Sequence, residues 1–151
     1  MRYRNELLVT AVVLGLALSS CRSATPIAFD HAGLQVRDLE KSVAFYRALG
    51  LHRLDDPFKD NIHIWLSLGG DQALHLLAGA PPGDAHRAMD VHLALRVRSI
   101  EDIVTTLNRL NVSYFNSKQV PQAITIRADG VRQIYLQDPD GYWLEINDAS
   151  R

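Results

Sequence analysis

The segments His31–Leu51, HAGLQVRDLEKSVAFYRALGL, and His92–Val112, HLALRVRSIEDIVTTLNRLNV, carry one pattern of residues twice, at a displacement of 61 positions. Both begin with histidine, and in both a leucine, a valine and an arginine follow at the same spacing. Such self-similarity indicates a duplicated unit. Within each copy the apolar residues first alternate and then recur every three to four positions, which predicts a strand that runs into an amphipathic helix.

The residues after each predicted helix also repeat, now at a displacement of 70 positions. IWLSLGGDQALHLLA, residues 64–78, aligns with IYLQDPDGYWLEIND, residues 134–148, and the second copy holds nine extra residues that we expect in FNSKQVPQAITIRADG. Each copy is therefore predicted to be a βαβββ module, about 27–79 and 90–148, joined by a Gly/Pro-rich linker. The expected fold is α+β, with one cup-like mixed sheet and the helices outside.

The predicted helix ends rest on particular residues. Asp38 and Ser99 are suitable N-caps, because their side chains can accept a hydrogen bond from the first turn. Gly50 and Asn111 are suitable C-terminal stops, because both residue types tolerate a left-handed backbone.

The N-terminus predicts export. Two arginines in MRYRNE precede LLVTAVVLGLAL, an apolar run too short to span a bilayer. LSSC then resembles the cleavage box of bacterial lipoproteins, so residues 1–20 are expected to be a signal peptide, Cys21 a lipidated residue and residues 21–26 a tether. Arg22 in place of aspartate favours the periplasmic side of the outer membrane. The alternative is that Cys21 is an ordinary unpaired thiol.

Composition narrows the classes of function. The chain has 151 residues, 47% of them hydrophobic, and a formal net charge of -1, which suits one domain with a real core. The charges are interspersed and no basic cluster alternates with aromatic residues, so the sequence gives no support for nucleic-acid binding.

Four polar residues interrupt otherwise apolar strands. Because side chains alternate along a strand, His31, His75, His92 and Glu145 each lie on the face opposite the aliphatic row. The repeat makes the first and third equivalent, and likewise the second and fourth, so a pseudo-twofold axis would bring them together. Imidazole and carboxylate ligands suit zinc, iron, nickel or manganese. A single strand histidine is more often a hydrogen-bonded core or surface residue; the repeated set favours a metal site.

The same segments, together with DPDGYWLEI at residues 138–146, resemble the vicinal oxygen chelate superfamily of glyoxalase I, extradiol dioxygenases and fosfomycin and bleomycin resistance proteins. The resemblance covers about Ile27 to Asp148 within a domain of residues 27–149. It implies a cup around a divalent metal ion with His31, His92 and Glu145 as ligands and His75 at a fourth position. Glyoxalase I usually has a carboxylate or amide at that fourth position, so the resemblance does not select one reaction.

The resemblance implies a metal-dependent lyase, isomerase or dioxygenase that holds a small substrate through vicinal oxygens. Glu145 could act as a base, and His63 or Tyr135, on the same strand faces by alternation, could supply a second acid or base. The alternative is a bleomycin-resistance-like lipoprotein that binds or sequesters a small molecule without catalysis. Family cups are commonly completed across subunits, so a homodimer is expected.

Overall fold

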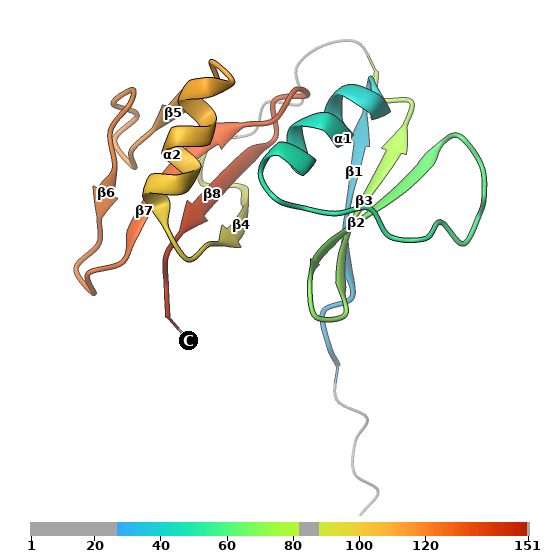
Figure 1. Cartoon of the computed structure of the whole chain (residues 1–151), viewed down its shortest axis with the longest axis horizontal. Helices are drawn as coiled ribbons and strands as arrows, with labels where there is room; N and C mark the ends of the chain where they lie inside the picture. Colours follow the sequence, from blue (N-terminus) through green and yellow to red (C-terminus); the bar gives the residue numbers. More distant parts are fainter. Residues whose placement is uncertain (1–26, 82–87, 151) are drawn as a thin grey trace, which may run out of the picture.

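The computed structural model describes residues 27–81 and 88–150. Module 1 and module 2 lie side by side, each with one helix (Figure 1). Module 1 comprises β1 (His31–Val36), α1 (Leu39–Ala48), β2 (His63–Gly69) and β3 (Gln72–Ala78). Module 2 comprises β4 (His92–Arg96), α2 (Ile100–Arg109), β5 (Tyr114–Phe115), β6 (Thr125–Ile126), β7 (Arg132–Gln137) and β8 (Trp143–Asn147).

The expected signal peptide, lipidated Cys21 and tether fall outside the described residues. Within residues 27–81 and 88–150, no helix is long and apolar enough to cross a membrane.

Both helices begin and end where the sequence predicts. The Asp38 side chain accepts a hydrogen bond from the backbone N–H of Lys41, and Ser99 caps α2 in the same way. After each helix the chain turns with a positive φ, 103° at Gly50 and 54° at Asn111. Glycine and asparagine adopt this conformation at low cost, so local sequence fixes both helix boundaries.

The strand pairings confirm the duplication. In module 1 the sheet order is β1-β3-β2, and in module 2 it is β4-β8-β7-β5 with β6 also paired to β7. The parallel pair β1/β3 aligns Gly33 with His75, and the equivalent pair β4/β8 aligns Ala94 with Glu145. Both modules thus use one register. The α+β class with mixed sheets is confirmed.

Two details refine the expected architecture. The described strands form a three-stranded and a five-stranded sheet, so β1 and β4 are each at an edge. Of the three strands expected after α1, the first is reduced to an isolated bridge between Arg53 and Leu66. One backbone hydrogen bond lies on either side of this bridge. Asp55 and Pro57 follow this bridge, and both residue types disfavour a longer strand.

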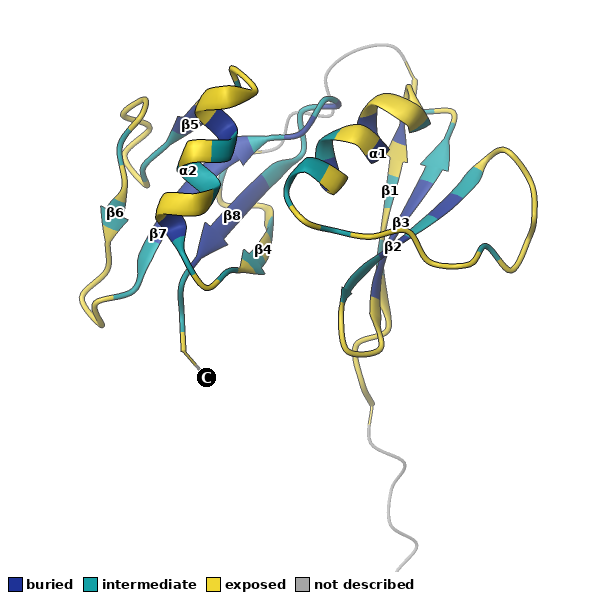
Figure 2. Cartoon of the chain, viewed as in Figure 1, coloured by how far each residue is buried: buried dark blue, intermediate teal, exposed yellow. Residues whose placement is uncertain are grey.

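The core lies between each sheet and its helix. Figure 2 shows β7 and β8 buried over much of their length, whereas the outer faces of the helices are exposed. Alternate strand residues such as Leu74, Leu76, Leu144 and Ile146 are at most 1% exposed and pack towards the helices. Burying side chains of this size stabilises the fold by about 1.5–3 kcal/mol each. The polar residues of the same strands are left facing away from the helices.

A buried polar junction joins the modules. The turn between β7 and β8 places Asp138 and Asp140 against α1 of module 1, where Tyr46 donates a hydrogen bond of 2.8 Å to Asp138. Asp140 accepts hydrogen bonds from the guanidinium of Arg37 at 2.7 Å and the hydroxyl of Ser42 at 3.2 Å. The sequence identifies this DPDG segment only as a turn; its carboxylates also hold the two modules together.

Candidate functional site

The strand registers place all the candidate residues on the side of the sheets that faces away from the helices, here called the cup face. In module 1 this face carries His31, His63, Trp65 and His75. In module 2 it carries the residues His92, Arg96, Gln133, Tyr135, Glu145 and Asn147. The alternation argument therefore assigns each candidate to the correct face.

Module 1 contributes a cluster of imidazole and aromatic rings. Trp65 stacks on His75 with ring centroids 3.9 Å apart, and His31 meets His75 edge-on at 5.7 Å. His63 also stacks on His75, with ring centroids 5.2 Å apart, and Phe58 lies 4.5 Å from the ring of His63. His75 is 8% exposed, so it is held rigidly between its neighbours.

Two histidine rings of this cluster are oriented by carboxylates. The Nδ1 atom of His31 is 2.5 Å from a carboxylate oxygen of Asp30, and Nδ1 of His63 is 2.8 Å from Asp60. Such a bond orients the ring and leaves Nε2 with its lone pair, as in most histidine–metal sites. His75 Nε2 is buried and has no hydrogen-bond partner among the described residues. Burial, and then the charges of His63 and His31, lower the pKa of His75, which favours its neutral form.

Module 2 contributes a histidine and a carboxylate that face each other. His92 Nδ1 lies 2.8 Å from the backbone carbonyl of Met89, and His92 Nε2 lies 3.4 Å from the Glu145 Oε2 atom. Two ligand atoms each about 2.1 Å from one ion, at a tetrahedral angle, stand at a similar separation. The geometry of this pair therefore fits a divalent ion.

The carboxylate of Glu145 is positioned by a chain of side-chain hydrogen bonds. Tyr135 donates to Oε2 at 2.8 Å, Asn147 donates to Oε1 at 2.7 Å, and Gln133 donates to the Tyr135 hydroxyl at 2.9 Å. Burial and then the hydrogen bond to Glu145 raise the pKa of Tyr135 to about 12. The phenol is thus a proton donor at neutral pH and does not act as a base in this state.

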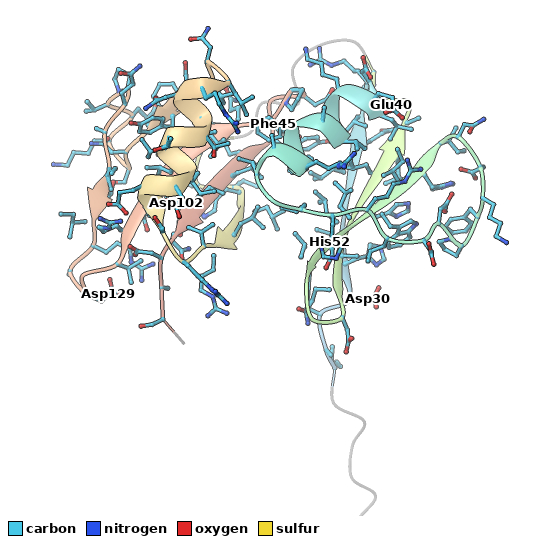
Figure 3. The ribbon with its side chains drawn as sticks, viewed as in Figure 1. Asp30, Glu40, Phe45, His52, Asp102 and Asp129 are labelled. Carbon is cyan, nitrogen blue, oxygen red and sulfur yellow. The ribbon has the colours of Figure 1, made fainter. Side chains whose placement is uncertain are left out.

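The four expected metal ligands lie in the chain as two pairs, His31 with His75 and His92 with Glu145. Figure 3 shows Asp30, at the start of β1, in one module and Asp129, after β6, in the other. In residues 27–81 and 88–150, no group of three or more His, Cys, Asp or Glu side chains is close enough to hold a metal ion. The described chain therefore presents the four expected ligands as two separate pairs, here called half-sites.

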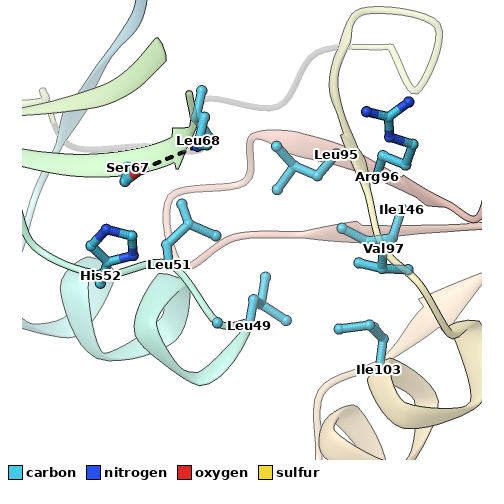
Figure 4. Close-up of a pocket in the computed structure, with 12 residues that line it drawn as sticks. Leu49, Leu51, His52, Ser67, Leu68, Leu95, Arg96, Val97, Ile103 and Ile146 are labelled. Atoms are coloured by element: carbon cyan, nitrogen blue, oxygen red, sulfur yellow. Dashed lines mark hydrogen bonds between the residues drawn. The ribbon is translucent and has the colours of Figure 1, made fainter. Parts of the chain in front are cut away.

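A separate apolar cavity of about 280 Å³ lies between the modules, away from the candidate residues (Figure 4). Leu49, Leu51 and Leu68 border it from module 1, and Leu95 and Ile103 from module 2. None of the four expected metal ligands lines it, and its polar lining offers no metal-binding set. This cavity is therefore not the candidate metal site.

Comparison with known proteins agrees with the fold. A profile of the Glyoxalase/Bleomycin resistance protein/Dioxygenase superfamily matches residues 28–146. The chain belongs to this superfamily. It is 28% identical over 123 residues to the uncharacterised protein YwbC of Bacillus subtilis (strain 168), a match that covers 78% of this chain and 94% of YwbC.

Solved structures from the superfamily share the fold. The oxidase ChaP-H1 superposes with a TM-score of 0.66 at 22% identity, over 83% of this chain and 98% of that one. The fosfomycin resistance protein FosX of Listeria monocytogenes superposes with a TM-score of 0.64 at 18% identity, over 83% and 96% of the two chains. At these identities the likeness establishes the fold alone.

Superfamily members commonly use divalent metal ions, and the donor atoms of this chain suit one. Three of the four expected ligands have the support that metal sites require: a bonded Nδ1 in His31 and His92, and hydrogen-bonded carboxylate oxygens in Glu145. The supporting residues Asp60, Gln133 and Asn147 were not identified from the sequence. Gln133 and Asn147 are each two residues from Tyr135 and Glu145 on the same strands. Because side chains alternate along a strand, the sequence could have placed both on the same face as these candidates.

Proposed function

We propose that the protein is a metal-dependent enzyme that acts on a small substrate held through vicinal oxygens. The observation that carries this proposal is the facing pair of His92 Nε2 and Glu145 Oε2 at 3.4 Å, with each side chain oriented by a further hydrogen bond. His31 supplies a third ligand and His75 a fourth or a tuning residue. Zinc, nickel, iron and manganese all accept this set of ligands.

We further propose that the two half-sites meet across a homodimer, so that His31 and His75 of one subunit complete the site with His92 and Glu145 of the partner subunit. Two features of the chain support this arrangement. β1 and β4 each end a sheet and have no second strand partner among residues 27–81 and 88–150. The first residues of both strands, His31 and His92, are exposed in the described chain. A second copy would cover these residues and bring the pairs together.

The residues around the site can perform acid–base chemistry. When bound, the ion would polarise the substrate oxygens and stabilise negative charge that develops on them. Glu145 can accept a proton, the Tyr135 phenol can donate one, and His63, oriented by Asp60, can serve at the opposite side of the cup. This set is compatible with a lyase, an isomerase or a dioxygenase.

The second candidate function is small-molecule binding or sequestration without catalysis. The observation that favours it is that the described chain, on its own, holds no group of three close metal-binding side chains. A cup that used only the stacked rings of Trp65, His75 and Phe58 would bind a planar ligand by contact alone. Metal content distinguishes the two candidates, because sequestration of this kind needs no ion.

The test is metal analysis of the full-length protein followed by activity assays. We expect about one divalent ion per chain by elemental mass spectrometry. With the ion bound, we expect turnover in one of three assays: oxygen uptake with catechols, isomerisation of hemithioacetals, or addition to epoxyphosphonates. A protein that binds no ion stoichiometrically, yet binds small planar ligands, would instead be a sequestering protein.

We also propose that Cys21 carries a lipid that anchors the protein to the periplasmic side of the outer membrane. Support comes from the apolar run and the LSSC segment that precede the domain. Wild type is expected in the membrane fraction of a producing diderm cell, and Cys21→Ala is expected to leave it because the acylation site is lost. Immunoblots of separated fractions measure this, with Ser23→Ala, a nearby variant that keeps the cysteine, as control. Identical distribution of wild type and Cys21→Ala would contradict lipidation.

A further inference from the structure

A second cavity lies on the cup face of module 2, beside Glu145. Its volume is about 460 Å³, within the range of roughly 300–1,000 Å³ typical of small-molecule sites. Its lining consists of Ala94, Arg96, Arg127, Asn147 and Ala149. Two of these five residues are arginines and none is acidic; because Arg127 is paired with Asp129, the uncompensated positive charge of the cavity comes from Arg96.

Arg96 lines this cavity from β4 and also borders the apolar cavity between the modules (Figure 4). It lies on the same face as His92, four residues further along the strand, and its Cα pairs with that of Asn147. Asn147 lies two positions after Glu145 on β8, so the Cα atoms of these two residues are about 7 Å apart at the usual rise per residue. In the described part of the chain, no hydrogen bond or ion pair holds the guanidinium of Arg96. Its donors are free to meet a ligand.

Arg127 enters the cavity from the turn after β6. Its backbone N–H bonds to the carbonyl of Val131, which fixes the turn, and its guanidinium lies 2.8 Å from Asp129. Both side chains of this ion pair are about half exposed, 42% and 53%, so the pair is weakly held and can yield to a stronger ligand.

Arginine is suited to recognise an oxyanion. Its planar guanidinium offers parallel N–H donors that match two oxygens of a carboxylate, phosphate or phosphonate. Two arginines that line one concavity also raise the local concentration of anions, because the protein wall focuses their field. Asn147 forms a fixed wall between this cavity and the metal half-site, since its amide donates to Glu145 and accepts from Ala149.

We propose that this cavity, the anion pocket, binds an oxyanion group of the substrate through Arg96 and Arg127. That the ligand is the substrate rests on the proposed function; the binding of an anion rests only on the two arginines and the cavity. The substrate would be a small bifunctional molecule, with its vicinal oxygens at His92 and Glu145 and an acidic group further along the same strand face, at Arg96.

The test uses metal-free full-length protein in detergent and three probes: inorganic phosphate, methylphosphonate and acetate. The side-chain Nε–Hε resonances of the arginines are followed by NMR during titration. We expect saturable shifts at Arg96 and Arg127, and at least tenfold weaker binding in Arg96→Gln and in Arg127→Gln. Arg109→Gln, at the exposed end of α2, removes the same charge elsewhere and should bind as wild type does.

The outcomes separate the two proposals. Binding of acetate alone assigns a carboxylate, and binding of phosphate or methylphosphonate alone assigns a phosphorus oxyanion; either supports the pocket. Absence of saturable shifts with all three probes overturns it, as does equal weakening in Arg109→Gln, which would indicate nonspecific charge. A protein that binds anions here but never binds a metal ion retains the pocket and loses the proposed enzyme function.

Discussion

Replacing His92 with alanine or Glu145 with glutamine is expected to abolish stoichiometric metal binding. These two side chains face each other at 3.4 Å and supply one neutral and one anionic ligand from β4 and β8. Loss of a supporting hydrogen bond already weakens metal sites by about 10 to 100-fold, so loss of a ligand should weaken this one by more than about 100-fold. Elemental analysis after gel filtration at equal protein and metal concentrations measures the effect.

Two further variants make this expectation specific. His52→Ala removes an exposed histidine outside the cup face and should load metal as wild type does. His75→Ala should retain part of the metal, because the other three expected ligands stay in place. Circular dichroism must first show that every variant is folded. If His92→Ala and Glu145→Gln bind metal as tightly as wild type, the site lies elsewhere and sequestration becomes the leading function.

The duplication explains why so much of the fold could be predicted. Strand alternation depends only on backbone geometry, so the face of His75 or Glu145 follows from parity once the strand is identified. The helix ends at Gly50 and Asn111 depend on local φ preferences and were likewise predicted. Repetition strengthened each inference, because the same register had to hold in both modules.

The features that the sequence did not predict depend on contacts between distant residues. Asp138 and Asp140 read as turn residues, yet their burial against α1 depends on how the modules pack. Asp60 lies in an irregular loop, where no periodicity shows that it will reach the ring of His63. Arg96 lies four residues from His92, so strand alternation could have placed it on the cup face. Only the structure shows that it lines a cavity there.

If the metal sites are shared between subunits, two chains that each lack half of the ligands should recover metal binding when they pair. One chain would carry His31→Ala with His75→Ala, which removes the module 1 ligands, and a differently tagged chain would carry His92→Ala with Glu145→Gln. Each homodimer would then hold two incomplete sites and should bind almost no metal. In the purified heterodimer, one site would lack all four ligands and the other would contain all four. We therefore expect about one ion per heterodimer, half the loading of wild type.

This complementation cannot arise if each chain builds its own site, because both variant chains lack two ligands. A heterodimer of two differently tagged wild-type chains should bind about two ions and controls for the effect of the tags. A heterodimer whose two chains both lack His31 and His75 should stay empty and controls for weak binding elsewhere. A complementing heterodimer that binds no more metal than its parent homodimers would contradict shared sites, as would a monomeric wild type that keeps its metal. Since β1 and β4 each end a sheet of the described strands and begin with an exposed histidine, the recovered ion would place one subunit's His31 beside the partner subunit's His92.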